Sequence, residues 1–112
     1  MHWIHLTDED QLQKIIVRSQ EKPQVIFKYR SHCQVSETIL QRLHRGCCPE
    51  HIDFHFLDSI AYNNISQKLS EIFHVSQQSP QIIVIKDGEP IFEETSSEVS
   101  LEEIVEQVSV SV

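Results

Sequence analysis

The stretch FKYRSHCQVSET, residues 27–38, places one cysteine where an apolar run gives way to a helix-like pattern. The thiolate is the nucleophile in disulfide chemistry, and a free cysteine with a pKa of about 8.5 is mostly protonated at neutral pH. The first turn of a helix favours the thiolate, because its backbone N–H groups are unpaired and its dipole is positive there. Cys33 is therefore a candidate nucleophile for thiol–disulfide exchange. The alternative is a small buried cysteine without a chemical role, which is common.

Basic and hydroxyl side chains near Cys33 favour the nucleophile. Arg30 and His32 precede it, and Lys28 adds positive charge if its side chain points the same way. Ser36 lies one helical turn later on the same face, where its hydroxyl can donate a hydrogen bond to the sulfur. Together these effects are expected to lower the thiol pKa by about one to a few units. We therefore predict that Cys33 and Ser36 are the catalytic pair.

Ser36 stands where a two-cysteine redox site has its second cysteine. A serine cannot attack a mixed disulfide, so the thiol that resolves it must come from elsewhere. Cys47 and Cys48 follow the helix that Cys33 begins, and a rise of 1.5 Å per residue separates them from Cys33 by about 20 Å. A disulfide needs Cα atoms within about 7 Å of each other. We therefore predict a monothiol catalyst that is resolved by a free low-molecular-weight thiol.

The elements that position these residues follow from the spacing of apolar side chains and from turn signals. Strands and helices are predicted in the order β-α-β-α-β-α-β-β-α. The predicted strands are 3–6, 24–29, 52–57, 81–85 and a short one around 91–92, and the predicted helices are 7–19, 33–45, one around 65–73 and one from 101 onward. This alternation, which ends in a hairpin and a helix, predicts an α/β fold: a three-layer α/β/α sandwich with a mixed central sheet, formed by a single domain over residues 1–112.

Four local signals mark where these elements begin and end. Thr7 can cap the first helix, and Gly46 is suited to the left-handed conformation that often follows a helix end. Residues 86–89, Lys-Asp-Gly-Glu, predict a tight hairpin turn. Residues 100–103, Ser-Leu-Glu-Glu, form a capping box that opens the last helix.

The order of elements, together with the segment SPQIIVIKDGEPIF, resembles the thioredoxin fold, in which a cis-proline leads into a strand, a Lys-Asp/Asn-Gly turn and the last strand. More closely, FKYRSHCQVS and SPQIIVIKDG resemble the YtxJ-like monothiol bacilliredoxins, whose site usually reads close to Thr-Arg-Cys-Pro-Ile-Ser. Cys33, Val35 and Ser36 fit that pattern. Gln34 stands in place of the proline, and His32 precedes the cysteine.

The resemblance implies thiol–disulfide exchange with bacillithiol, which the protein would remove from mixed disulfides on client proteins. The expected partners are bacillithiolated proteins and the low-molecular-weight thiol itself as co-substrate, with no bound cofactor. It also implies that Pro80 follows a cis peptide bond and that Ser79 offers backbone hydrogen bonds to the substrate. Taken alone, Pro80 fits an ordinary trans proline at a strand start equally well. Arg30, His32 and Gln34 complete the predicted substrate-binding residues.

Charge is distributed unevenly along the chain. The net charge is −8, and from Asp87 onward the sequence contains only acidic charged residues, whereas basic residues dominate between Lys22 and Arg45. Nucleic acid is therefore not an expected partner. The malate group of bacillithiol is anionic, so a basic patch of Arg30, Lys28 and Arg42 is expected to attract it.

Other features of the sequence indicate a cytoplasmic protein that is not in a membrane. No run of about 18 apolar residues is present, and the N-terminus does not resemble a signal peptide. Three cysteines, two of them adjacent, also make a poor disulfide framework for a secreted domain.

Two other functions compete with redox catalysis. A thioredoxin-fold binding or adaptor module would leave Cys33 unused, with an ordinary thiol pKa. A small metal site is the other possibility, because paired zinc ligands are usually two to four residues apart. Its ligands would come from His44, Cys47, Cys48, His51 and His55. Adjacent cysteines point apart, however, and His55 lies in a predicted strand, so we predict no metal site.

Overall fold

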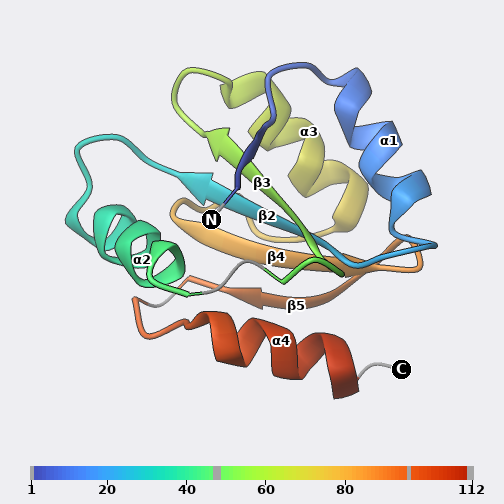
Figure 1. Cartoon of the computed structure of the whole chain (residues 1–112). Coiled ribbons are helices and arrows are strands. Elements are labelled where there is room, and N and C mark those ends of the chain that lie inside the picture. Colours follow the sequence, from blue (N-terminus) through green and yellow to red (C-terminus); the bar gives the residue numbers. More distant parts are fainter. Residues whose placement is uncertain (1, 47–48, 96, 111–112) are drawn as a thin grey trace.

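The computed structural model describes residues 2–46, 49–95 and 97–110. The predicted order of elements is confirmed (Figure 1). The strands are β1 (Ile4–His5), β2 (Gln24–Tyr29), β3 (Asp53–Asp58), β4 (Gln81–Lys86) and β5 (Glu89–Glu94), and the helices are α1 (Asp10–Arg18), α2 (Gln34–His44), α3 (Asn63–Phe73) and α4 (Leu101–Val110). No helix in the described ranges is long and apolar enough to cross a membrane.

The five strands form one mixed sheet in the order β1-β3-β2-β4-β5. β3 pairs in parallel with β1 and β2, whereas β4 pairs antiparallel with β2 and β5. Lys28, near the end of β2, lies opposite Gln81, the first residue of β4. This register places the segment that follows β2 beside the segment that precedes β4, which is where the predicted site residues are.

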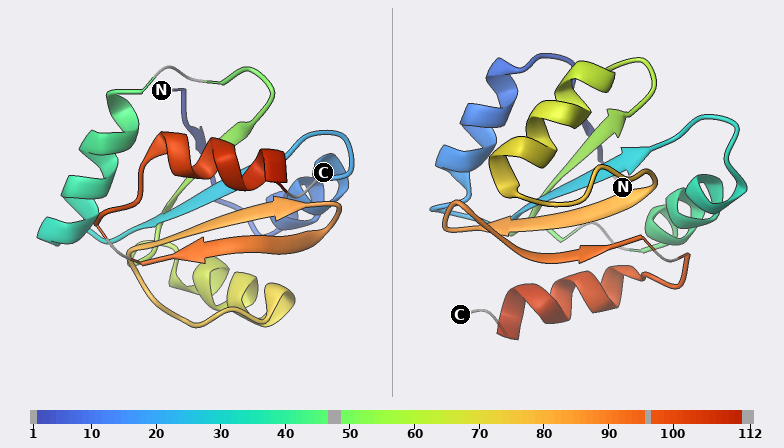
Figure 2. Two further views of the ribbon diagram at one scale, coloured as in Figure 1. Left: turned by 90° about the horizontal axis from the view of Figure 1, so that it is seen from below. Right: turned by 180° about the vertical axis from the view of Figure 1, so that it is seen from behind.

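Helices cover both faces of the sheet. α1 and α3 lie on one face, and α2 and α4 lie on the other (Figures 1 and 2). Alternation along β2 explains the two faces, because successive side chains of a strand point in opposite directions. Phe27 packs with residues of α2 and α4, and Ile26 packs with residues of α1 and α3. The predicted three-layer sandwich is confirmed.

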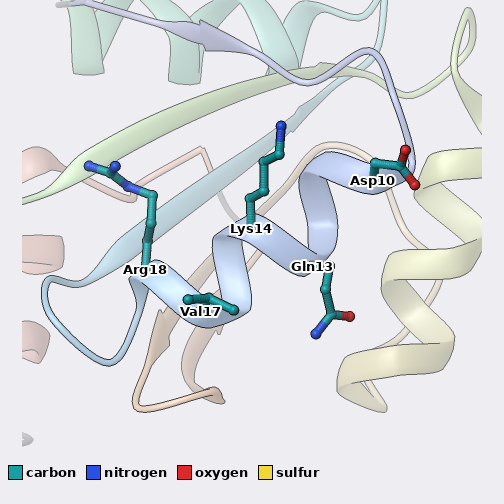
Figure 3. A pocket seen from close by; sticks show the side chains of 5 residues that line it. All are labelled: Asp10, Gln13, Lys14, Val17 and Arg18. Carbon is teal, nitrogen blue, oxygen red and sulfur yellow. The ribbon is translucent and has the colours of Figure 1, made fainter.

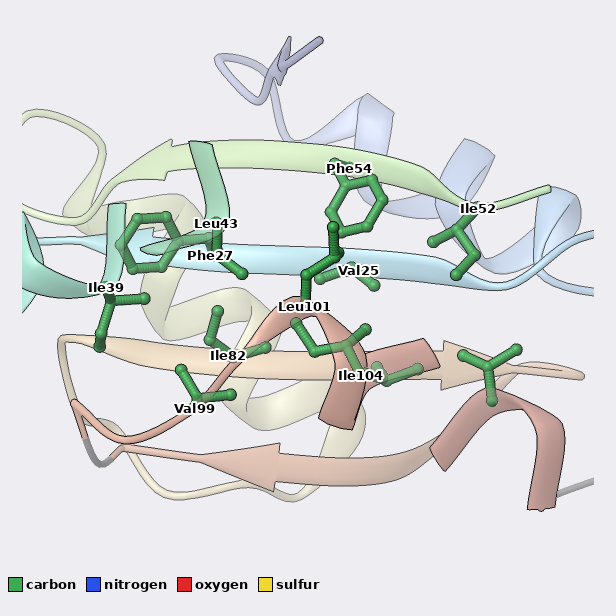
Figure 4. Packing of buried hydrophobic residues seen from close by; sticks show 12 residues of the cluster. Val25, Phe27, Ile39, Leu43, Ile52, Phe54, Ile82, Val99, Leu101 and Ile104 are labelled. Carbon is green, nitrogen blue, oxygen red and sulfur yellow. The ribbon is translucent and has the colours of Figure 1, made fainter. Parts of the chain in front are cut away.

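Each face has its own apolar core. The core beneath α2 and α4 is shown in Figure 4 and includes Phe27, Ile39, Leu43, Ile82 and Ile104, all fully buried. Burying such side chains stabilises the fold by roughly 1.5–3 kcal/mol each. Ile39 and Leu43 fix the rotation of α2 on the sheet, and with it the position of the residues that begin the helix.

The prediction that Thr7 caps the first helix is wrong. α1 begins at Asp10, whose backbone N–H donates to the Asp8 carboxylate over 2.9 Å. The side chain of Gln11 reaches back, and its oxygen accepts hydrogen bonds from the backbone N–H groups of Thr7 and Asp8 at 2.8 and 2.9 Å. These bonds hold residues 7–9 as a turn ahead of the helix.

Gly46 does not adopt the left-handed conformation predicted for it; among the described glycines, Gly88 has a positive φ. The reason for a glycine at position 46 is a close approach instead. A Cβ atom there would overlap the side chain of Leu101 in α4. The end of α2 therefore packs directly against the start of α4.

The hairpin turn and the serine cap of the last helix behave as predicted. Asp87 and Gly88 have φ values of 53° and 77°, as a tight hairpin between β4 and β5 requires. The hydroxyl of Ser100 accepts a hydrogen bond from the backbone N–H of Glu103 at 3.2 Å, so Ser100 caps α4.

Candidate active site

Cys33 is the residue immediately before α2 and serves as its N-cap, with an extended backbone (φ −120°, ψ 119°). Its carbonyl accepts the first hydrogen bond of the helix, from the backbone N–H of Glu37 at 3.1 Å. Its side chain is half-buried and is a free thiol. The sulfur thus lies at the end of the helix where unpaired N–H groups favour negative charge.

Hydrogen bonds from the first turn of α2 lower the pKa of the Cys33 thiol. The largest contribution is the backbone N–H of Ser36, followed by its hydroxyl, with smaller contributions from the backbone of Val35 and the charge of Arg30. Partial burial of the sulfur acts in the opposite direction. The arrangement stabilises the thiolate, as a nucleophile at neutral pH requires.

Ser36 connects the thiol to the loop before it. Its side chain is completely buried, and its hydroxyl oxygen accepts a hydrogen bond from the backbone N–H of Arg30 at 3.1 Å. The hydroxyl hydrogen is then free to point to the Cys33 sulfur. One buried hydroxyl therefore both fixes the loop that follows β2 and donates to the nucleophile.

His32 forces a sharp turn just before the nucleophile. Its φ of 59° is in the left-handed region, which histidine enters more readily than most residues but still seldom. Its side chain is exposed, and it is not among the causes that lower the thiol pKa of Cys33. We did not anticipate this backbone conformation, because no glycine or asparagine signals it.

A hollow of about 510 Å³ opens at the thiol. It is lined by Tyr29, Ser31, His32, Cys33, Gln34 and Glu37. The hydroxyl of Tyr29 donates a hydrogen bond to the Glu37 carboxylate, and this bond is the main reason why the pKa of Tyr29 is raised. Tyr29 and Glu37 were missed by the sequence reasoning. The available signal was that Glu37 is the one acidic residue in the basic stretch and lies one turn after Cys33.

A second, polar hollow of about 380 Å³ lies between the segment that follows β2 and the segment that precedes β4, and residues of both line it. It brings together Arg30 and Ser79, two of the predicted substrate-binding residues that lie far apart in the sequence. The remaining lining residues are polar and come from α3 and nearby loops: Ser59, Asn63, Ser66, Gln77 and Gln78. Arg30 supplies the charge in this set.

The peptide bond between Ser79 and Pro80 is cis. Pro80 comes directly before Gln81, which lies opposite Lys28 in the pairing of β2 with β4. Continuing that register by one and two positions places Pro80 and Ser79 beside the residues that lead from β2 towards Cys33. The substrate-binding roles of Ser79 and Pro80 stay predictions.

The basic patch expected from Arg30, Lys28 and Arg42 is not formed. The Lys28 side chain is completely buried and donates a hydrogen bond to the hydroxyl of Ser70 in α3 at 3.1 Å. The guanidinium of Arg42 donates to the backbone carbonyl of Ser97 at 2.9 Å, far along the chain. Of these three cations, Arg30 acts on the thiol. The patch prediction was wrong because it ignored the directions in which the side chains point.

The alternative metal site receives no support from its described members. His55 is buried, and its Nε2 atom is 2.8 Å from the side-chain oxygen of Gln24. Among the residues that the structure describes, no group of three possible metal ligands occurs. Cys47 and Cys48, which the metal site would also need, lie outside the described residues, so their predicted distance from Cys33 stays a prediction.

One further hollow on the described surface is lined by residues of α1. It measures about 650 Å³ and runs along α1, with Asp10, Gln13, Lys14, Val17 and Arg18 around it (Figure 3). It contains none of the predicted site residues. A depression lined by a single helix has no convergent polar groups and is a poor binding site.

Solved structures with the same architecture define the class of protein. A candidate oxidoreductase with a thioredoxin fold matches with a TM-score of 0.79 at 18% identity, over 93% of this chain and 91% of that one. Malassezia sympodialis thioredoxin matches with a TM-score of 0.75 at 19% identity, over 97% of each chain. Fasciola hepatica thioredoxin matches with a TM-score of 0.70 at 17% identity, over 95% and 96%. The protein therefore has the thioredoxin fold.

The family is defined by sequence. The model of the family described as "Monothiol bacilliredoxin BrxC" matches residues 4–104, and the chain belongs to that family. This confirms the predicted relationship and, with the fold, supports a thiol redox function. No curated protein matches the chain.

Proposed function

We propose that this protein is a thiol–disulfide oxidoreductase that removes bacillithiol from protein mixed disulfides through Cys33. The observation that carries the proposal is the position of Cys33 at the start of α2, where the N–H groups of Val35 and Ser36 and the Ser36 hydroxyl lower its pKa. The adaptor alternative expects an ordinary thiol pKa, and this environment counts against it.

The reaction proceeds by two exchanges. The Cys33 thiolate attacks the bacillithiol sulfur of the mixed disulfide, the S–S bond to the client breaks, and the client leaves as a thiolate. A second bacillithiol, as thiolate, then attacks the disulfide on Cys33 and releases oxidised bacillithiol and the reduced protein. Ser36 has no sulfur with which to form an internal disulfide, so the second thiol comes from solution. This chemistry belongs in a reducing compartment, and we propose the cytoplasm.

The polar hollow that contains Arg30 and Ser79 fits the rest of the proposed substrate. Bacillithiol joins a sugar and a malate to its cysteine, so it presents hydroxyls and carboxylates. Arg30 provides a cation for a carboxylate, and the side chains of Asn63 and Ser66 and the backbone near Ser79 provide hydrogen-bond partners. In this proposal His32 and Gln34 border the thiol side of the same site.

Mass spectrometry of the protein after mixing with a bacillithiolated client tests the proposal. We expect bacillithiol to appear on Cys33 and to stay there until free thiol is added. Cys33→Ser should abolish transfer, whereas the double variant Cys47→Ser, Cys48→Ser is the matched control and should keep the first step. An internal disulfide from Cys33 to either of those cysteines would refute the monothiol mechanism. Absence of any transfer to Cys33 would refute the function.

A further inference from the structure

Lys28 is a buried cation close to the proposed active site but not part of its thiol chemistry. It lies near the end of β2, on the face covered by α1 and α3, and its side chain is completely buried. Burying an ammonium is unfavourable unless it is well hydrogen-bonded, and an apolar side chain would fill this position in the core at lower free energy. Packing alone therefore does not explain a lysine here.

A chain of hydrogen bonds leads from Lys28 to the loop that follows α3. The Lys28 ammonium donates to the Ser70 hydroxyl at 3.1 Å, and that hydroxyl in turn donates to the backbone carbonyl of Ser76 over a longer 3.5 Å. From β4, the side-chain nitrogen of Gln81 lies 3.3 Å from the Ser76 hydroxyl. Ser76 is thus bound through both its backbone and its side chain.

Charge supports the same network from β5. The Gln81 side-chain nitrogen also donates to the Glu93 carboxylate at 3.0 Å, and the charge of Glu93 attracts the Lys28 ammonium. The side-chain oxygen of Gln81 is buried and has no hydrogen-bond partner among the described residues. Lys28 lies directly opposite Gln81 in the sheet, so the two side chains reach the loop from neighbouring strands.

The loop bound in this way presents one wall of the polar hollow. It begins at His74, in the left-handed conformation at the end of α3, and it ends at the cis bond before Pro80. Between them, Gln77, Gln78 and Ser79 line the hollow that contains Arg30. A shift of Ser76 would move these three residues.

We propose that Lys28 is a positioning residue that, through Ser70 and together with Gln81, holds the 74–80 loop so that Ser79 meets the substrate. The contact with substrate rests on the proposed function, whereas the anchoring of the loop does not. Lys28 does not touch the thiol and is not among the causes of the Cys33 pKa, so the anchoring of this loop and the reactivity of the thiol depend on different residues.

Lys28→Met and Ser70→Ala test the proposal, because each removes one end of the first hydrogen bond. Gln24→Met is the matched control: Gln24 is on the same strand and the same face, is equally buried, and bonds Asp53 at the opposite end of β2. Two backbone N–H groups report on the loop: that of Val75 donates to the Ser70 carbonyl at 3.3 Å, and that of Gln78 donates to the Ser76 carbonyl at 3.1 Å. We expect faster hydrogen exchange at both groups in both test variants and not in the control.

Kinetics provide the second measurement. Both test variants lose the hydrogen bond between the Lys28 ammonium and Ser70, so the loop must be ordered when substrate binds. Loss of one such bond to a charged group corresponds to an increase of about tenfold in the KM for a bacillithiolated client. The rate of Cys33 alkylation at pH 7 should not change. Unchanged exchange in both Lys28→Met and Ser70→Ala would overturn the anchoring. Faster hydrogen exchange with an unchanged KM would overturn the contact between Ser79 and substrate. If the wild-type protein transfers no bacillithiol to Cys33, the proposed function is overturned, and the hydrogen-exchange measurement still decides whether Lys28 anchors the loop.

Discussion

Replacing Lys28 by methionine should make the protein more stable at neutral pH. Burial lowers the pKa of Lys28 from 10.5 to about 8, against the opposing attraction of Glu93. At about 1.36 kcal/mol for each pH unit, this corresponds to roughly 3 kcal/mol of unfavourable burial of the charged form. Relaxation of the protein around the ammonium reduces that figure to about 2–3 kcal/mol. Methionine also loses the hydrogen bond from the charged ammonium to Ser70, about 1.5 kcal/mol, so the expected net gain at pH 7 is about 1 kcal/mol.

The pH dependence has a definite sign. Because the pKa of Lys28 is lower in the folded state, the unfolded chain holds more protons between about pH 8 and 10.5. The contribution of Lys28 to the free energy of unfolding of the wild type therefore increases as the pH rises through that window. Below pH 8 the unfavourable burial of the charged form is fully present. Lys28→Met lacks this contribution, so the stability difference between the two proteins should narrow or reverse by pH 10.

Urea unfolding of both proteins at pH 7 and pH 10, under reducing conditions, measures this difference. Comparing the two proteins at each pH cancels the contributions of tyrosines and cysteines that titrate in the same range. A less stable Lys28→Met at pH 7, or a difference that does not change with pH, would refute the view that Lys28 is a destabilising buried cation. Greater stability combined with a higher KM would instead be the trade-off expected of a positioning residue.

Three further substitutions test the site and the fold. Ser36→Ala should raise the pKa of Cys33 and slow its alkylation by iodoacetamide at pH 7; an unchanged pH profile would contradict the hydrogen bond to sulfur. Arg30→Gln should raise the same pKa by less, and an effect larger than that of Ser36→Ala would reverse the assigned order of causes. Gly46→Ala should destabilise the fold by about 1–3 kcal/mol in urea unfolding through overlap with Leu101, and wild-type stability would show that α4 can move aside.

The part of the fold and site that the sequence predicts is the part governed by local rules. The order of the elements follows from apolar spacing, and the hairpin turn at Asp87 and Gly88 follows from backbone sterics. The proximity of Cys33 and Ser36 follows from the pitch of one helical turn. None of these needs knowledge of what packs against the element.

What the sequence does not predict depends on contacts between distant segments. The direction of the Lys28 side chain is set by which face of β2 the helices α1 and α3 cover. The need for glycine at position 46 arises from α4, which begins 55 residues later at Leu101. The left-handed turn at His32 lies in the loop between β2 and α2. This loop is held by a hydrogen bond from the backbone N–H of Arg30 to the hydroxyl of the buried Ser36.

The same distinction separates the two tasks of the proposed enzyme. The nucleophile needs the first turn of α2 and the nearby Arg30, so its pKa should respond to Ser36 and Arg30 and hardly to changes elsewhere. Recognition needs the loop before Pro80, which reaches the nucleophile only because β4 pairs antiparallel with β2. That loop is bound by side chains from β2, α3 and β4 rather than by its own hydrogen bonds alone. Variants of the buried network should therefore change which substrates bind while leaving the reactivity of the thiol intact, and variants of the helix start should do the opposite.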